Sequence, residues 1–365
     1  MALWDSVASV VSTGKLRQYR PTPEVASLIF AVYSNAMDVG SLIGARLAVG
    51  IPGPDATEDV IERLRQTQAQ TLVVFSRNFT SPDQFTRLLR RLEERLERRL
   101  LVMVDHEGGR VVRFNRGVTH FPDAKAVGRT QDPDAVERQG ATEAEELRRL
   151  GVHVNLAPCV DVVVEGSDPV IGDRSYGSDP ARVSLLSVAR IRGLQSRGVA
   201  ACVKHFPGLG AVPRDPHLVL PTISLDWTAM RSTHLVPFEA AIRAGVAMVM
   251  SSHVCYPLLD DPQGLPATFS AHLIRDVLRQ TLGFAGLILT DDLEMGALRT
   301  CGTIGEACVR ATEAGHDLLL ICSDLAAAQA SSDALHEAYQ SGRLSIAELE
   351  EIVHRVELAR QQFLT

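Results

Sequence analysis

Short, continuous apolar runs recur along the chain, separated by longer segments with an amphipathic pattern. Continuous runs of this length are typical of parallel strands that are buried on both faces. The eight runs are Arg46–Gly50, Leu72–Phe75, Leu101–Asp105, His153–Leu156, Ala201–His205, Met248–Ser252, Leu287–Asp291 and Leu318–Cys322. Eight strand-helix units predict an α/β fold, a single-domain, TIM-like (β/α)8 barrel. A doubly wound open sheet is the alternative, but no G-x-G-x-x-G follows the first run to support nucleotide binding.

Two of the segments between the runs carry clear helix-start signals. Ser81–Gln84 combines an N-cap serine, a proline at the first helical position and a glutamine that reaches back as a capping box. Ser345–Glu348 is a second capping box, in which Leu344 and Leu349 are placed as a hydrophobic staple. This second signal predicts a C-terminal helix that runs towards Phe363.

The N-terminal residues 1–43 precede the first run and contain no chemical motif. We predict that they form a helical extension packed on the barrel, which then covers residues 44–365. The apolar stretch Val25–Ile51 is interrupted by polar residues such as Asp38 and Arg46. It therefore predicts a helix followed by a strand, and no membrane span. The first residues lack the basic region of a signal peptide, so we expect a cytoplasmic protein.

Composition narrows the function classes. The 365 residues are 45% hydrophobic and 22% charged, which excludes global disorder. A formal net charge of -7 gives no basic surface for nucleic acid, so we expect no nucleic-acid partner. We separately expect a small-molecule substrate and a monomer or weak homo-oligomer. The six cysteines form no C-x-x-C and no Cys/His cluster at zinc-finger spacing, so no metal or cofactor is implied. Cys159, Cys202 and Cys322 lie in apolar runs, which favours buried, reduced thiols.

Two adjacent carboxylates follow the seventh run. Asp291 comes at its end, where a side chain can point into the mouth of a barrel and act as a nucleophile. The alternative for Asp291 is a cap on the next segment. Because successive side chains of a strand alternate, Asp292 faces elsewhere and is interpreted as an acceptor in a loop or helix cap.

A carboxylate and an imidazole lie two residues apart in the loop after the fifth run. His217 is a suitable proton donor near neutral pH, and Asp215 can raise its pKa and select its tautomer. A sugar acetal is cleaved when one group protonates the leaving oxygen and another captures the anomeric carbon. Together with Asp291, the pair points to glycoside chemistry. On its own, an Asp-x-His loop is also typical of solvated surface.

Further polar residues at the ends of the runs form a candidate sugar clamp. Asp105 follows the third run beside paired glycines that let the backbone approach a ligand, and its carboxylate can accept two sugar hydroxyl groups. Arg113, Arg174 and Lys204 add donors. The alternatives are exposed ion pairs for the arginines and a satisfied core position for His205.

Five ordered motifs carry a family resemblance. They are Leu72-Val73-Val74-Phe75-Ser76-Arg77-Asn78-Phe79, Val104-Asp105-His106-Glu107-Gly108-Gly109-Arg110-Val111-Val112-Arg113-Phe114, Ile171-Gly172-Asp173-Arg174-Ser175, Lys204-His205-Phe206-Pro207-Gly208 and Thr290-Asp291-Asp292-Leu293. From Arg46 to Leu320 the chain resembles glycoside hydrolase family 3, in its single-domain β-N-acetylhexosaminidase (NagZ-like) branch. The resemblance implies a TIM-like barrel. It also implies retaining removal of terminal β-linked N-acetylglucosamine from peptidoglycan-derived or chitin-like fragments.

The resemblance also implies residue roles. Asp291 matches the nucleophile, and His217 with Asp215 matches a mobile-loop acid/base pair that replaces the usual second carboxylate. The mechanism implied is attack by Asp291 on the anomeric carbon while His217 protonates the leaving oxygen. Water activated by His217 then releases the glycosyl-enzyme. The positions that match sugar-binding residues of the family are Asp105, Arg113, Arg174, Lys204 and His205.

The chain departs from the branch in the loop after the fifth run. Leu209 and Ala211 replace a histidine and an aspartate, and Pro216 replaces a serine between the two members of the pair. Pro216 pushes Asp215 out of the helical region and removes an amide donor. The spacing to His217 is unchanged. A phosphorolytic enzyme and a sugar-binding barrel without turnover therefore stay open as alternatives, and a β-glucosidase fits the loop less well.

Overall fold

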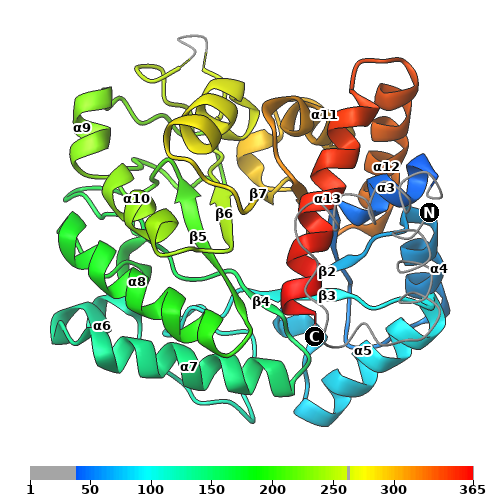
Figure 1. Cartoon of the computed structure of the whole chain (residues 1–365), viewed down its shortest axis with the longest axis horizontal. Helices are drawn as coiled ribbons and strands as arrows, with labels where there is room; N and C mark the ends of the chain where they lie inside the picture. Colours follow the sequence, from blue (N-terminus) through cyan, green and yellow to red (C-terminus); the bar gives the residue numbers. More distant parts are fainter. Residues whose placement is uncertain (1–37, 261–263, 365) are drawn as a thin grey trace, which may run out of the picture.

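Eight parallel strands close into a barrel in chain order from β1 to β8 (Figure 1). The computed structural model describes residues 38–260 and 264–364. The strands are β1 Leu47–Gly50, β2 Thr71–Val74, β3 Leu101–Val104, β4 Val154–Asn155, β5 Ala200–Phe206, β6 Met248–Ser251, β7 Leu287–Asp292 and β8 Leu318–Ile321. Each overlaps one of the eight apolar runs. The predicted barrel is confirmed, and the open sheet is excluded because β8 pairs with β1.

Helices surround the barrel. The α-helices are α3 Val39–Ala45, α4 Glu58–Thr67, α5 Pro82–Leu96, α6 Ala124–Thr130, α7 Pro133–Arg149, α8 Pro180–Ser196, α9 Trp227–Ser232, α10 Leu235–Arg243, α11 Ile304–Ala314, α12 Leu325–Gln340 and α13 Ile346–Phe363. A π-helix, His272–Thr281, follows β6, and short 3₁₀ helices lie at Ser76–Asn78, Gly172–Arg174, Ala267–Phe269 and Gly296–Leu298. Helix α3 leads into β1, as predicted for this part of the stretch from Val25 to Ile51. Most of the predicted N-terminal extension, residues 1–37, lies outside the described residues.

The two predicted helix starts are found where expected. Ser81 accepts a hydrogen bond from the Gln84 backbone N–H at 3.2 Å, and Ser345 accepts one from the Glu348 N–H at 3.4 Å. The prediction that the Gln84 side chain accepts from the N-cap residue Ser81 is wrong by one residue. The Gln84 side chain accepts from the Thr80 N–H, at 2.9 Å, instead of the Ser81 N–H.

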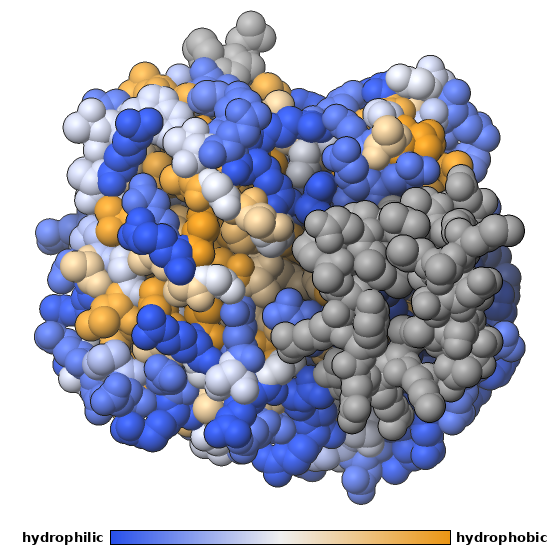
Figure 2. All heavy atoms as spheres, viewed as in Figure 1, coloured by the Kyte–Doolittle hydropathy of each residue, from blue (hydrophilic) through white to orange (hydrophobic). Residues whose placement is uncertain are grey.

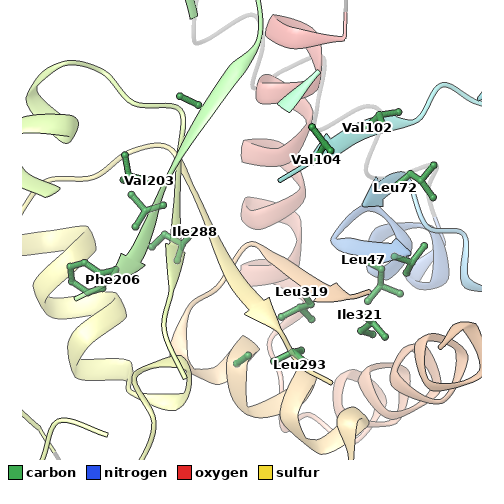
Figure 3. Packing of buried hydrophobic residues seen from close by; sticks show 14 of the residues in the cluster. Leu47, Leu72, Val102, Val104, Val203, Phe206, Ile288, Leu293, Leu319 and Ile321 are labelled. Carbon is green, nitrogen blue, oxygen red and sulfur yellow. The ribbon is translucent and has the colours of Figure 1, made fainter. Parts of the chain in front are cut away.

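Strand side chains divide between two hydrophobic layers. In β1, Leu47 and Val49 belong to the layer between strands and helices, whereas Ala48 points into the barrel. This alternation follows from the period of two along a strand. Figure 3 shows the outer layer, with side chains of several strands directed towards the helical shell. Both faces of the sheet are thus buried, which explains why the strands read as continuous apolar runs.

Helix α13 closes the N-terminal end of the barrel. Arg360 donates to the carbonyl groups of Gln70 and Arg99, which precede β2 and β3, at 3.0 Å each. Val356 and Phe363 pack into the inner layer. Figure 1 shows α13, in red, running across the strands, and Figure 2 shows hydrophilic side chains around the edge of this face with hydrophobic ones gathered over its left half. The C-terminal ends of the strands are left for the functional site.

Two sequence expectations about the chain as a whole can be compared with the structure. All six cysteines are free, and Cys159, Cys202 and Cys322 are buried as predicted. Among the described residues, no helix has the length and apolar character needed to cross a membrane.

Candidate active site

A cavity of about 980 Å³ opens among the loops that follow the strands. Its walls combine polar groups with apolar side chains such as Phe75, Leu156 and Met250. The lining includes all eight predicted site residues: Asp105, Arg113, Arg174, Lys204, His205, Asp215, His217 and Asp291. Residues up to 186 positions apart in sequence are therefore neighbours in one site, since Asp105 and Asp291 both line it. Their chemical roles remain predictions.

Asp291 lies in β7, one residue before its end. The backbone N–H of Asp292 donates to its carboxylate at 2.8 Å. Burial alone would raise the pKa of Asp291, but His205, His253 and that backbone N–H outweigh burial and hold the pKa below its usual value. The carboxylate is therefore ionised at neutral pH, the form required of a nucleophile.

Asp292 acts as a loop acceptor, as predicted, but it lines the same cavity as Asp291, so the prediction that it faces elsewhere is wrong. Its Oδ1 accepts from the backbone N–H groups of Glu294, at 3.1 Å, and Cys322, at 3.3 Å, and so joins the ends of β7 and β8. Burial, together with the nearby Glu294 and Asp291 carboxylates, raises the pKa of Asp292 to about 7. Folding therefore favours the protonated form of this carboxyl group.

Replacing Asp292 by Asn is expected to reduce the decrease in the free energy of unfolding between pH 5 and pH 8. The native pKa of Asp292 lies above the value of about 3.9 in an unfolded chain. The protonated form is thus favoured by folding, and this contribution is complete below pH 4 and is lost as pH rises through 7. In Asp292→Asn, Oδ1 can still accept both backbone hydrogen bonds. Urea unfolding at pH 5 and pH 8 should show a smaller decrease for the variant, by about 2 kcal/mol; an equal decrease would contradict the assignment.

Two carboxylates and three cations form an ionic cluster on one wall of the cavity. Lys204 Nζ lies 2.6 Å from Asp105 Oδ1 and 2.7 Å from Glu107 Oε1. Arg174 donates two hydrogen bonds to Glu107, at 2.9 and 2.8 Å. Arg113 lies 3.5 Å from Asp105 Oδ2. The side chain of Arg174 is only 11% exposed, so the exposed ion pair that was its alternative is excluded.

Glu107 is a site residue that sequence reasoning missed. It lies in the same motif as Asp105, but its partners Arg174 and Lys204 are 67 and 97 residues away. No sequence pattern near Glu107 predicts these ion pairs. Burial would raise the pKa of Glu107, but the two cations lower it strongly. The Asp105 and Glu107 carboxylates in turn hold the pKa of Lys204 above its usual value despite burial. Glu107 therefore orients the donors that face the cavity.

We expect Glu107→Gln to destabilise the protein by about 3–5 kcal/mol, because it leaves Arg174 and Lys204 buried with less compensating charge. The free energy of unfolding in urea measures this. A matched control is Glu145→Gln, which removes an exposed pair with Arg197 at 3.3 Å and should cost less than about 1 kcal/mol. Equal decreases in the free energy of unfolding would show that the buried cluster stabilises the protein no more than an exposed ion pair does.

His205 is positioned by a second missed residue, Asp161. The His205 Nδ1 lies 2.7 Å from Asp161 Oδ2, and the Asp161 carboxylate also accepts from the backbone N–H groups of His205 and Leu209. The ring is therefore a satisfied histidine, as its alternative interpretation held, and it also lines the cavity. Asp161 follows β4 and pairs across 44 residues, which the sequence pattern could not show.

The same place contains a group whose ligand atoms lie within 4.8 Å of one another, formed by Cys159, Asp161 and His205. These atoms already bond one another: the Cys159 thiol donates to Asp161 Oδ2 at 3.3 Å, and Asp161 accepts from His205. Burial, followed by the Asp161 charge, raises the pKa of the Cys159 thiol well above its usual value, whereas metal ligation requires the thiolate. The contacts thus favour a positioning role for this group.

Asp215 and His217 form a direct pair at the rim of the cavity. Asp215 Oδ1 lies 2.6 Å from His217 Nδ1 and accepts from the His217 backbone N–H at 2.8 Å. The His217 side chain is 57% exposed and that of Asp215 is 30% exposed. Pro216 between them leaves its carbonyl group free to accept a hydrogen bond from the Ala297 N–H, at 3.1 Å. The substitution that distinguishes this loop is therefore compatible with the pairing.

The replaced residue Leu209 also has a defined place. Its backbone N–H donates to Asp161 Oδ1 at 2.6 Å, and its side chain is 3% exposed and lines the cavity. A leucine here gives an apolar wall at a position where the branch carries a histidine. Ala211 packs against the outer hydrophobic layer.

A closed parallel barrel whose strand ends gather a partly buried carboxylate, an aspartate-histidine pair and a polar clamp around one cavity defines a barrel glycosidase. Comparison with known proteins agrees. Residues 38–359 match the model of the glycosyl hydrolase family 3 N-terminal domain. The chain belongs to this family and is a glycosidase.

Individual relatives support the assignment. The chain is 38% identical over 284 residues to a beta-hexosaminidase of Nitrosomonas eutropha, covering 76% of this chain and 80% of that protein. It resembles the structure of a family 3 beta-N-acetylglucosaminidase from a Paenibacillus species, with a TM-score of 0.87 and 35% identity over 90% of this chain; it spans 63% of that protein. It also resembles NagZ from Neisseria gonorrhoeae in complex with N-trifluoroacetyl-D-glucosamine, with a TM-score of 0.72 and 30% identity. The match covers 85% of this chain and 97% of that protein.

Proposed function

We propose that this protein is a retaining β-N-acetylglucosaminidase that acts through a covalent glycosyl-enzyme. The observation that carries the proposal is that one cavity is lined by the ionised Asp291 from β7 and by the Asp215–His217 pair from the loop after β5. These are the nucleophile and the proton donor that retaining cleavage requires. The names of the relatives, a beta-hexosaminidase and a beta-N-acetylglucosaminidase, support the choice of sugar.

In the first step His217 protonates the leaving oxygen and Asp291 attacks the sugar. Because Asp215 engages Nδ1, the ring atom that faces the glycosidic oxygen is Nε2. The proton passes from Nε2 to that oxygen, the bond from the oxygen to the anomeric carbon breaks, and an oxygen of Asp291 bonds to the carbon. The Asp215 carboxylate orients the ring through its contact with Nδ1.

In the second step the neutral His217 takes a proton from water through Nε2. The resulting hydroxide oxygen bonds to the anomeric carbon and the bond to Asp291 breaks, so the carboxylate and the imidazolium are restored. The sugar is meanwhile held by the ionic cluster. Asp105 offers carboxylate oxygens to hydroxyl groups, and Arg113, Arg174 and Lys204 supply donors.

A panel of aryl β-glycosides tests the proposal. The N-acetylglucosaminide should be cleaved much faster than the glucoside or the xyloside, and preferential cleavage of the glucoside would overturn the sugar assignment. Proton NMR during the first minutes should show the β-anomer of the released sugar, whereas the α-anomer would contradict retention. Sugar 1-phosphate formed only with added phosphate would identify a phosphorylase, and binding of N-acetylglucosamine without turnover would identify a sugar-binding barrel.

The biological setting is likewise proposed. We infer that the substrate is a peptidoglycan-derived or chitin-like fragment, and that the protein acts in the cytoplasm as a monomer or weak homo-oligomer. Six free cysteines, five of them buried, support a reducing compartment. Release of N-acetylglucosamine from each fragment class, and the mass measured by light scattering, test these points.

A further inference from the structure

The loop that carries the Asp215–His217 pair is held to the chain segment that follows Asp291. After β7 the chain passes through Leu293 into a short 3₁₀ helix, Gly296–Leu298. The Gly296 backbone N–H donates to the His217 carbonyl oxygen at 3.2 Å, and the Ala297 N–H donates to the Pro216 carbonyl oxygen at 3.1 Å. Two consecutive amide groups thus bind two consecutive carbonyl groups.

The contact requires a glycine. A β-carbon at Gly296 would lie 2.4 Å from the His217 carbonyl oxygen and 2.9 Å from that of Leu218. Both atoms are backbone, so the loop would have to move. The φ angle of Gly296 lies outside the positive range, and the backbone at this position therefore accepts an L-residue without strain. The close approach of the loop is what excludes a side chain.

The rest of the loop is attached to other parts of the barrel. The Tyr256 hydroxyl group donates to the Gly208 carbonyl at 3.0 Å, and the Ile223 N–H donates to the Cys255 carbonyl at 2.9 Å. The Val164 N–H donates to the Gly210 carbonyl at 3.0 Å. These contacts anchor the two ends of the loop, whereas the amide groups of Gly296 and Ala297 bind it at the pair itself.

We propose that the Gly296–Ala297 segment is the dock that fixes the Asp215–His217 pair over the cavity, and that Gly296 is a positioning residue for the proton donor. The assignment of the pair as the acid/base rests on the proposed function. The docking links the donor mechanically to the strand that carries Asp291. The two groups that must act on opposite sides of one glycosidic bond therefore share a support, which preserves their relative placement.

Gly296→Ala tests the docking without reference to activity. The added methyl group should displace the loop, so amide hydrogen exchange of a peptide covering residues 214–220 is expected to become at least about tenfold faster. Gly53→Ala is a matched control, because its β-carbon meets nothing within 4 Å and its φ is not positive. Unchanged exchange in Gly296→Ala would overturn the proposal. If this variant does not fold, Ala297→Pro, which removes the N–H bonded to Pro216 and also restricts the backbone of Gly296, should produce the same faster exchange.

The kinetic arm tests positioning. Gly296→Ala is expected to lower kcat/KM for an unactivated chitobioside about 10- to 100-fold, but to lower it much less for an activated aryl N-acetylglucosaminide that needs little protonation. In a protein that already carries His217→Ala, adding Gly296→Ala should lower kcat/KM for the chitobioside hardly any further. Equal losses on both substrates, or an undiminished loss in the double variant, would show that Gly296 acts independently of His217. If the parent protein cleaves neither substrate, the proposed function is wrong. Faster amide exchange in Gly296→Ala would still support docking of the loop by Gly296 and Ala297.

Discussion

Asp291→Asn is expected to lower kcat on an aryl N-acetylglucosaminide by about 10⁴-fold or more, because an amide cannot form the covalent intermediate. The substitution keeps the shape of the side chain, and its Oδ1 can still accept from the Asp292 N–H. We therefore expect a folded variant with nearly unchanged binding of N-acetylglucosamine. Steady-state kinetics and calorimetric titration with the sugar measure the two quantities.

The intermediate itself gives a more direct observation. Rapid mixing with an activated substrate, followed by denaturation and mass spectrometry, should place a sugar adduct on a peptide that contains residues 287–292. The adduct should be absent from Asp291→Asn. Asp173→Asn is a suitable control, since Asp173 lines the cavity but pairs with Arg110 at 2.7 Å, and its side chain is 39% exposed. A folded Asp291→Asn protein with full activity would exclude Asp291 as the nucleophile.

The sequence predicts the barrel well because the information is local. Each strand is a continuous apolar run, and a strand buried on both faces needs no distant partner to be recognised. Differences occur at the ends. Strand β5 continues to Phe206, one residue beyond the run, and β4 has only Val154 and Asn155. The end of a strand depends on where the neighbouring strand stops pairing, and one chain segment alone does not contain that information.

The site is predicted less completely, and the reason is again distance along the chain. Asp291 and the Asp215–His217 pair stand in recognisable motifs. Glu107 becomes meaningful only when folding brings Lys204 beside it, and Asp161 only when His205 lies at 2.7 Å. Burial makes such partners necessary, because an unpaired charge in the interior is costly. A search for buried carboxylates next to predicted cations would find both residues, but it requires the fold first.

His217→Ala is expected to affect substrates according to their leaving groups. General acid catalysis contributes about 10²–10⁴-fold, and a poor leaving group such as a sugar hydroxyl needs all of it. A dinitrophenolate leaves without protonation, so kcat/KM for its glycoside should fall by less than about tenfold. The rates of a chitobioside and of a dinitrophenyl N-acetylglucosaminide, measured with the same enzyme preparation, give the comparison.

The second step supplies an independent check on the same residue. Without His217 no base activates water, so the glycosyl-enzyme formed from the activated substrate should accumulate, and added azide, which needs no base, should restore turnover and yield a glycosyl azide. Leu218→Ala is a matched control, because Leu218 is 74% exposed in the same loop. Similar losses on both substrates without azide rescue would assign His217 a structural role. Leaving-group dependence together with azide rescue would assign both proton transfers to His217, whose Nε2 is the ring nitrogen that Asp215 does not engage.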